Sequence, residues 1–373
     1  MIGIPRQKNQ LVHRVWTIAL AVLALSLASA CVSFPDAPAW RTTPTTKKDV
    51  LRSFDGTELA LREWVADEPK AVFIALHGMN DYSFFVDAAA SWWAEYGQIH
   101  TYAYDQRGFG ANANIPTKVG HWAGSDTMAL DLRAAVEAVR AVHPDTPLYV
   151  LGHSMGGAVV LRAMADDPLP VDGAILVAPA VWGSSQMPLI FRLALNLSAG
   201  LAPGKSLTGE RAGRAPSDNR EALRALFEDP LVIKETRLDA TLGVVRLMGE
   251  AWRATDDVGG NVLVLIGEKD EIIPPKSIMA SAERLCGTVT VRQYQDGWHM
   301  LLRDRQAETV WRGVLDWVRA DQNNDRGQNQ DLVGNKKTPQ AETGEIGPAA
   351  LSCPELGQQA RSITANARTN FGK

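Results

Sequence analysis

Short apolar runs alternate with stretches of helical periodicity from about residue 50 to residue 320, and this alternation limits the possible folds more than any other feature of the chain. The apolar runs that we interpret as strands are 50–54, 59–64, 71–76, 100–104, 148–151, 173–177, 261–266 and 288–294. The helices expected between and after them are 85–96, 127–142, 158–165, 277–285 and 305–320. Strands that alternate with helices in this way form a mostly parallel sheet covered by helices on both faces. The predicted fold class is therefore α/β.

The alternation stops between about residues 180 and 254, where we expect a helical insertion without strands. Its helical pieces are expected at 189–197, 219–227 and 241–251, separated by glycine, proline and polar residues. The first part of the insertion is strongly apolar, through Trp182, Met187, Leu189, Ile190, Phe191, Leu193 and Leu195. Such side chains can pack on the core, line a pocket for an apolar chain or touch a membrane, and the sequence leaves these alternatives open.

Residues 1–30 are typical of a signal peptide. They contain Arg6, Lys8 and Arg14 but no acidic residue, and an apolar run then covers 15–27. That run is shorter than the about 20 residues that a membrane-spanning helix needs, but it suits the core of a signal peptide. Small residues follow at 28–30, directly before a cysteine.

The sequence that ends at Cys31 resembles the lipobox of bacterial lipoproteins. The resemblance implies that Cys31 is the site of lipid attachment and becomes the mature N-terminus, which would anchor the protein to a membrane of the bacterial cell envelope. The alternatives are an ordinary signal peptide, which would release a periplasmic or secreted protein, and an uncleaved anchor. Residues 31–48 are rich in proline, threonine and alanine, and we expect them to form a tether.

The folded part is expected to be one domain over residues 49–320, with the insertion at about 180–254 inside it. From residue 321 to 373 the composition shifts to asparagine, glutamine, glycine, threonine and lysine, which predicts a disordered tail. The chain has 38 basic and 42 acidic residues, so it lacks the basic surplus of a nucleic-acid-binding protein. Its three cysteines form no Cys-x-x-Cys pair, which argues against a structural zinc site and against a disulfide framework.

A serine lies between glycines where a predicted strand gives way to a predicted helix. The segment Gly152-His153-Ser154-Met155-Gly156 follows the apolar run at 148–151. Small neighbours permit the strained strand-to-helix turn that lifts a nucleophilic hydroxyl above a sheet. We therefore predict Ser154 as a catalytic nucleophile, and we expect the His153 side chain to have a packing role or a polar contact beside it.

A serine nucleophile needs a base and an acid, which follow it in the chain order acid, then histidine, in this kind of fold. Of seven histidines only His299 lies after Ser154, so His299 is the predicted base. The acid is expected just after the strand at 261–266, where Asp270 is the preferred candidate. Glu268 and Glu271 are the alternatives, and each is better interpreted as a solvated loop charge.

The negative oxygen formed during attack on a carbonyl must be met by backbone N–H donors. Met155, directly after the serine, supplies one of them. The strand at 71–76 leads into His77-Gly78-Met79, where this architecture provides a second donor, so the Met79 N–H is the other candidate and His77 is expected to be structural. The glycines in 105–110 lack the third glycine of a dinucleotide site, and a structural turn is the favoured interpretation.

Five motifs together resemble the α/β-hydrolase superfamily: HGMN at 77–80, DQRGFG at 105–110, GHSMGG at 152–157, GEKDEIIPP at 267–275 and DGWH at 296–299. Within it they look most like the monoacylglycerol lipase and lysophospholipase branch, which has a helical cap at the place of the insertion. The resemblance implies Ser154, Asp270 and His299 as the triad, Met79 and Met155 as the oxyanion hole, and no cofactor or metal.

The function expected from the sequence is the hydrolysis of a carboxylic ester in a lipid-like monoester, such as a monoacylglycerol or a lysophospholipid, through an acyl-enzyme. The expected partners are this substrate and the membrane that would hold the N-terminal lipid. A general esterase or thioesterase is the alternative among enzymes, because the same triad serves any activated acyl group. A catalytically silent surface lipoprotein is the alternative from another class of protein.

Overall fold

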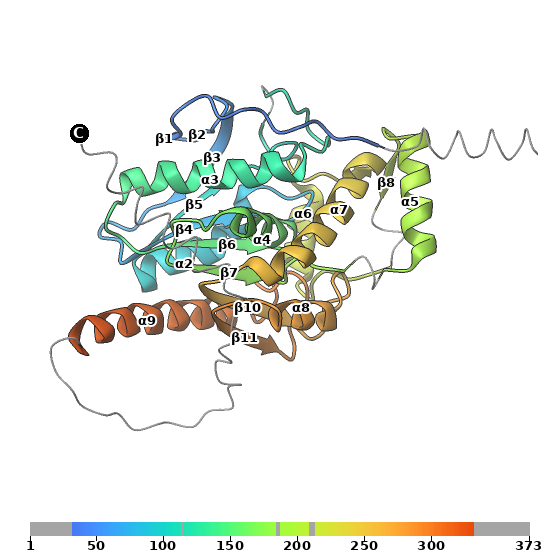
Figure 1. Ribbon diagram of the computed structural model, residues 1–373. Helices are drawn as coiled ribbons and strands as arrows, with labels where there is room; N and C mark the ends of the chain where they lie inside the picture. The colour runs from blue at the N-terminus through green and yellow to red at the C-terminus, as the bar shows by residue number, and fades with distance from the viewer. Residues whose placement is uncertain (1–31, 113–114, 184–186, 209–212, 332–373) are drawn as a thin grey trace, which may run out of the picture.

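The computed structural model describes residues 32–331 except 113–114, 184–186 and 209–212, and a nine-stranded sheet crosses its centre (Figure 1). The strand order across the sheet is β1-β2-β3-β5-β4-β6-β7-β10-β11. The bounds of these strands are Thr45–Lys47 (β1), Val50–Arg52 (β2), Glu58–Trp64 (β3), Ala71–Leu76 (β4), Ile99–Tyr104 (β5), Leu148–His153 (β6), Gly173–Val177 (β7), Asn261–Gly267 (β10) and Thr288–Tyr294 (β11).

The sheet is parallel from β5 to β11 and antiparallel from β1 to β3, with β3 also antiparallel to β5. Every residue of β4, β5, β6 and β7 is buried. Burial along the whole length of a strand requires helices on both faces of the sheet. The predicted α/β fold class is confirmed.

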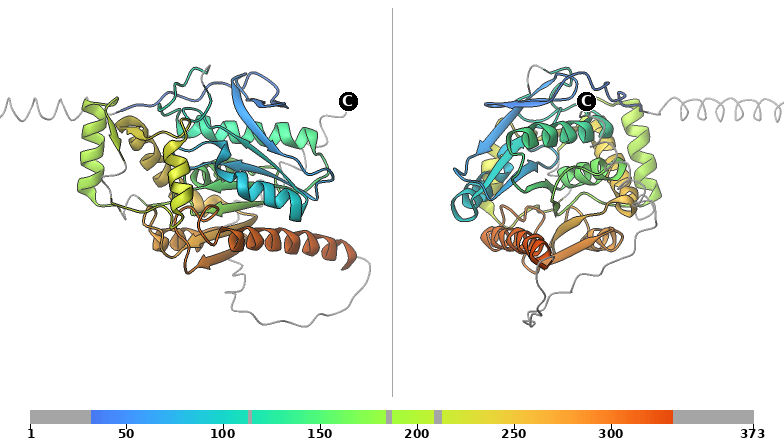
Figure 2. Two further views of the ribbon diagram at one scale, coloured as in Figure 1. Left: turned by 180° about the vertical axis from the view of Figure 1, so that it is seen from behind. Right: turned by 60° about the vertical axis from the view of Figure 1, so that its left-hand side comes forward.

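Helices lie on both faces of the sheet (Figure 2). On one face, α2 (Asp87–Gly97) and α9 (Ala307–Asp331) share a core with Phe73 and Tyr149. On the other face, α3 (Ser125–Val142), α4 (Met155–Asp166) and α8 (Pro275–Ala282) pack against a second, larger core. Among the helices of the described residues, none combines the length and the apolar character that crossing a membrane requires.

The insertion between β7 and β10 forms a cap over one end of the sheet. Its elements are α5 (Leu189–Leu201), β8 (Ser206–Thr208), α6 (Arg220–Glu228), β9 (Glu235–Arg237) and α7 (Leu238–Ala254). The helices lie where we expected them, and α7 packs against α4. The expectation that the insertion contains no strand was wrong, because β8 and β9 pair as a small antiparallel sheet, with α6 between them in the chain. Each of these strands has three residues, which is too short to give a recognisable alternation of apolar and polar residues.

The last helix extends beyond the end expected from the sequence. We expected the tail to begin at residue 321, but α9 continues to Asp331. Asp321 accepts hydrogen bonds from the Tyr149 hydroxyl, at 2.6 Å, and from the Asn261 amide, at 2.5 Å. These bonds hold a polar turn of α9 against β6 and β10. The composition of the segment does not predict such contacts. Residues 332–373 lie outside the described part of the chain.

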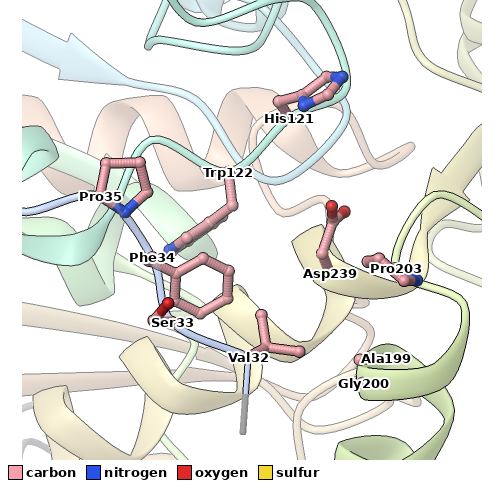
Figure 3. Close-up of a pocket in the computed structure, with 10 residues that line it drawn as sticks. All are labelled: Val32, Ser33, Phe34, Pro35, His121, Trp122, Ala199, Gly200, Pro203 and Asp239. Carbon is pink, nitrogen blue, oxygen red and sulfur yellow. The ribbon is translucent and has the colours of Figure 1, made fainter. Parts of the chain in front are cut away.

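The segment from residue 32 to residue 44, which lies in the range expected to form a tether, contacts the domain at several places. The Arg246 guanidinium, on α7, donates from Nη1 to the Val32 carbonyl oxygen at 2.7 Å and lies over the Phe34 ring. The Phe34 ring also contacts Trp122. Residues 32–35, the end of α5 and the start of α7 line a hollow of about 380 Å³ (Figure 3). Apolar side chains in the segment allow this packing, despite its proline and threonine content.

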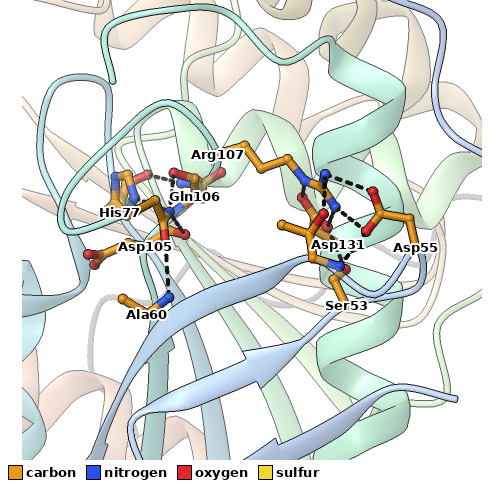
Figure 4. Close-up of polar contacts among 10 residues, drawn as sticks. Ser53, Asp55, Ala60, His77, Asp105, Gln106, Arg107 and Asp131 are labelled. Atoms are coloured by element: carbon orange, nitrogen blue, oxygen red, sulfur yellow. Dashed lines mark hydrogen bonds and ion pairs between the residues drawn. The ribbon is translucent and has the colours of Figure 1, made fainter. Parts of the chain in front are cut away.

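Arg107 joins the loop after β5 to α3 and to the turn between β2 and β3 (Figure 4). Its Nε donates to Asp131 Oδ2 at 2.7 Å, and its Nη2 donates to Asp55 Oδ1 at 2.9 Å. In the same loop, Gly110 has φ of 61°, and a Cβ there would lie 2.2 Å from Asp105 Oδ2. The DQRGFG motif therefore shapes a loop, in agreement with its structural interpretation.

Candidate active site

Ser154 lies on a strained turn between β6 and α4, at the position that the sequence predicted. Its φ of 51° and ψ of −114° are rare for a residue with a side chain. The turn is held by two hydrogen bonds, from the Ser154 N–H to Val177 O at 3.0 Å and from the Ala180 N–H to Ser154 O at 2.8 Å. A Cβ on Gly156 would lie 2.3 Å from the Leu76 carbonyl oxygen, so only glycine allows α4 to approach β4 this closely.

The structure brings Ser154, His299 and Asp270 into one hydrogen-bonded row. The Ser154 hydroxyl lies 2.9 Å from His299 Nε2, and His299 Nδ1 lies 2.7 Å from Asp270 Oδ2. All three residues are buried. The other oxygen of the Asp270 carboxylate accepts the N–H groups of Ile272 and Ile273, at 2.8 and 2.9 Å. In this arrangement the serine hydroxyl donates to a neutral imidazole, whose other N–H donates to a carboxylate fixed in orientation.

The two glutamates that were alternatives for the acid do not take part in this row. Glu268 is exposed. Glu271 is also exposed, and its carboxylate accepts the N–H of Ala215 in the cap at 2.7 Å. The geometry therefore places Asp270, and neither glutamate, behind His299.

His153 has a contact that the sequence suggested only in general terms. Its Nε2 donates to the carbonyl oxygen of His299 at 3.0 Å, and its ring stacks on Phe85. Burial lowers the pKa of His153 well below its ordinary value, so the imidazole stays neutral. His153 therefore fixes the backbone of His299 without placing a positive charge beside it.

The two predicted oxyanion donors lie in different elements, Met155 at the start of α4 and Met79 in the loop after β4. Within the described part of the chain, neither backbone N–H donates to another protein group. A Cβ on Gly78 would lie 3.3 Å from the Ser154 Cβ, so the loop packs directly on the turn that carries the serine. Both N–H groups are thus free to receive a negatively charged oxygen.

His77 orients the peptide group that contains the Met79 N–H. Its Nε2 accepts from the Gln106 N–H at 2.9 Å (Figure 4). Its proton is therefore on Nδ1, which donates to the Gly78 carbonyl at 2.7 Å. Because a trans peptide is planar, fixing this carbonyl on one side directs the Met79 N–H to the other side. Burial lowers the pKa of His77 and keeps this tautomer neutral. His77 therefore has a structural role, as expected, and the group that it orients is the peptide between Gly78 and Met79.

The cap is bonded to the loop that carries His299 through an acid that no motif identified. Asp304 accepts from Ser217 Oγ, in the cap, at 2.5 Å and from the Trp298 N–H at 2.7 Å. The Met300 N–H donates to the Pro216 carbonyl at 2.9 Å. Burial raises the pKa of Asp304 above its ordinary value. Asp304 lies five residues after the DGWH motif and belongs to no recognised motif. Its contact with Ser217 is therefore evident only from the structure.

Cys31, the predicted site of lipid attachment, lies outside the described residues, as does the signal peptide predicted over residues 1–30.

The fold and the row of serine, histidine and aspartate define a serine hydrolase of the α/β-hydrolase fold. The chain belongs to the family described as serine aminopeptidase, S33 (Hydrolase_4), whose model matches residues 67–306. Members of a family with this fold differ in substrate, so the family description does not by itself assign one.

Its relatives are of the lipase and esterase kind. The chain is 25% identical to a monoacylglycerol lipase of Mycolicibacterium smegmatis over 272 residues, which cover 70% of this chain and 93% of the relative. It is 26% identical to a monoglyceride lipase of Mus musculus, covering 76% of this chain and 95% of the relative. A phospholipase of Bacillus subtilis, YtpA, is 24% identical over 67% of this chain and 96% of its own length.

Solved structures share the fold. A monoacylglycerol lipase of Paleococcus ferrophilus superposes with a TM-score of 0.59 and 23% identity, over 71% of this chain and 99% of that structure. A thermostable carboxyl esterase of Bacillus coagulans superposes with a TM-score of 0.63 and 18% identity, over 73% of this chain and 97% of that structure.

Proposed function

We propose that this protein hydrolyses the carboxylic ester of a lipid-like monoester, such as a monoacylglycerol or a lysophospholipid. The observation that carries the proposal is the hydrogen-bonded row of Ser154, His299 and Asp270 beside the free N–H groups of Met79 and Met155. The relatives described as monoacylglycerol lipases and as a phospholipase support the choice of a lipid ester.

The geometry supports a two-step reaction. His299 Nε2 takes the proton of Ser154 as its oxygen attacks the ester carbonyl, and the N–H groups of Met79 and Met155 stabilise the tetrahedral oxyanion. Asp270 stabilises the imidazolium formed in this step. The intermediate then expels the alcohol, which takes the proton from His299. Water, deprotonated by His299, attacks the acyl-serine, and its proton returns to Ser154 as the fatty acid leaves.

The exposed side of α5 supports a lipid substrate. Its outward stripe is apolar, with between 39% and 75% of each residue exposed, and consists of Leu189, Ile190, Leu193, Leu197 and Leu201. Four of these residues are spaced by four, so they share one side of the helix. Exposed apolar stripes of this kind mark surfaces that bind an apolar partner. Between residues 187 and 208 the only charged side chains are Arg192 and Lys205, both basic, which suits a lipid surface.

The buried side of α5 packs against the cap. Leu195 is buried with Leu238 and Leu242 of α7, and Val32 of the N-terminal segment packs on the same cluster. The packing interpretation therefore holds for Leu195, whereas the outward stripe fits contact with lipid.

We also propose that Cys31 carries the lipid anchor of a bacterial envelope protein. The described chain begins at Val32, which packs against the cluster that includes Leu195 and Ala199 of α5 (Figure 3). An anchor on the preceding residue would hold the apolar stripe of α5 next to the bilayer. Mass spectrometry of the mature N-terminus tests this: a diacylated Cys31 is expected, and an unmodified N-terminus elsewhere would remove the anchor.

Hydrolysis of a panel of esters by the purified full chain tests the substrate. We expect monoacylglycerol and lysophospholipid with long acyl chains to have the highest kcat/KM, because each methylene buried in an apolar site adds about 0.8 kcal/mol. Equal rates on short and long esters would favour a general esterase, and faster cleavage of thioesters would favour a thioesterase. Absence of any hydrolysis would favour a catalytically silent lipoprotein.

A further inference from the structure

Met79 lies between two residues that are held from opposite directions. Gly78 is held by the core, through the hydrogen bond from His77 to its carbonyl oxygen. Asn80 is held by the cap: its carbonyl oxygen accepts the Ile233 N–H at 2.9 Å, and its Nδ2 donates to Thr236 Oγ1 at 2.6 Å. The loop with the Met79 N–H is thus attached to the cap by both the backbone and the side chain of its neighbour.

The backbone of Asn80 makes this attachment significant. Its φ of 65° lies in the left-handed region, which asparagine enters at a lower cost than most residues but still disfavours. A residue in such a conformation persists when surrounding contacts hold it. The two hydrogen bonds from the cap are contacts of this kind.

The cap side of the attachment is itself ordered. Thr236 is the central residue of β9 and pairs with Leu207 of β8. Asp229, at the end of α6, accepts a hydrogen bond from the Tyr82 hydroxyl at 2.6 Å. The cap segment from residue 229 to 236 therefore holds the loop at two successive places, on Asn80 and on Tyr82.

We infer that Asn80 and Thr236 are positioning residues, which form a clasp that aims the Met79 N–H at the oxyanion when the cap is seated. The inference rests on the proposed function and adds to it a dependence of catalysis on the cap. An oxyanion donor must lie about 2.7–3.1 Å from the developing charge, so a small rotation of the Met79 peptide weakens its effect on the transition state. The clasp thereby acts on turnover, and substrate binding does not depend on it.

Substitution of Thr236 tests the clasp in the full chain. Thr236→Val keeps the shape of the side chain and removes the acceptor of the Asn80 amide, whereas Thr236→Ser keeps the hydroxyl. Thr208→Val is the matched control, because Thr208 lies in the same two-stranded sheet and is exposed. The measurements are kcat and KM on a short soluble ester and the Ki of a trifluoromethyl ketone, whose adduct with the serine places an oxyanion in the hole.

We expect Thr236→Val to lower kcat about tenfold, a part of the loss of 10²–10³ that follows removal of an entire donor, and to change KM less than twofold. The Ki of the ketone should rise by the same factor as kcat falls. Thr236→Ser should restore both, and Thr208→Val should behave as the wild type.

The inference is overturned if Thr236→Val retains kcat and Ki within twofold of the control, or if its loss is confined to KM or to the melting temperature. A wild type that neither hydrolyses esters nor binds the ketone would overturn the proposed function together with the clasp. An active wild type with an unaffected Thr236→Val would overturn the clasp alone.

Discussion

The imidazole of His153 donates a hydrogen bond from Nε2 to the backbone carbonyl of His299 at 3.0 Å. The residue before the nucleophile thus supports the backbone of the catalytic base, although the two are separated by 146 positions in the chain. The stacking of His153 on Phe85 fixes its ring, and burial keeps it uncharged. The serine and the histidine are therefore held relative to each other by a contact beside the reacting atoms.

His153→Leu should lower kcat about tenfold, because the His299 carbonyl loses its donor and small misplacements of a catalytic group are costly. KM on a soluble ester should change little. His143→Gln serves as the control, since His143 bonds to Tyr102 and has no contact with the triad among the described residues. Equal kcat in the two variants would show that the contact does not position His299.

Asp270→Asn should lower kcat by about 10³–10⁴, because an amide favours the wrong tautomer of His299 and no longer stabilises its cation. Glu268→Gln, in the same loop but exposed, should leave kcat close to that of the wild type. Steady-state rates on a soluble ester measure both. A larger loss in Glu268→Gln would transfer the role of the acid to that residue.

The outward stripe of α5 gives a prediction about aggregated substrate. Leu193→Ser combined with Leu197→Ser should reduce hydrolysis of monoacylglycerol in vesicles at least tenfold, because full burial of each leucine in lipid is worth roughly 1.5–3 kcal/mol and a part of this is enough for such a loss. Rates on a short soluble ester should not change. Val65→Ser with Val142→Ser, at two other exposed apolar positions, is the matched control. Similar losses in both double variants would exclude α5 as a specific lipid contact.

The stability of the fold should fall in mild acid because of His100. Burial, with a smaller effect of neighbouring His143, lowers the pKa of His100 to about 4. The unfolded chain binds the proton below its ordinary pKa of about 6.5, so the contribution of His100 is complete above that pH and is lost as the pH falls to about 4. The free energy of unfolding should decrease over this window by at most about 3 kcal/mol through this residue, because Glu63 Oε2, 3.6 Å from His100 Nε2, offsets part of the cost of protonation.

His100→Phe tests the pH prediction, because phenylalanine keeps the stacking on Tyr102 and cannot be protonated. Denaturant unfolding of the variant should depend less steeply on pH between 6.5 and 4 than that of the wild type. Identical slopes would mean that His100 does not titrate as its burial implies.

The fold could be predicted from the sequence where apolar runs are long and bounded. The limits of β4, β7 and β11 were predicted at the observed residues, because glycine, proline or charged residues border each of these runs. The strands β8 and β9 are too short and too exposed to give a recognisable pattern of apolar residues. The packing of Phe34 against Arg246 depends on residues that are distant in the chain. The proline and threonine content of the segment indicated a tether and gave no sign of this contact.

The same distinction applies to the site. Ser154, His299 and Asp270 follow from a motif, from chain order and from the end of a strand, and the structure brings them together. Asn80 with Thr236, and Asp304 with Ser217, are single polar residues that meet only after the cap folds over the sheet. No motif in the sequence identifies such pairs, because the length of the inserted cap determines how many residues separate the two partners.

The most direct test of the account is covalent labelling of the full chain with a fluorophosphonate, followed by mass spectrometry of the digested protein. We predict one adduct, on Ser154. Labelling should be abolished in Ser154→Ala, while the circular dichroism spectrum and the melting temperature stay those of a folded protein. Ester hydrolysis should fall in the same variant by several orders of magnitude. Labelling of Ser154→Ala at the wild-type rate, or retention of its ester hydrolysis, would contradict the assignment of Ser154 as the nucleophile.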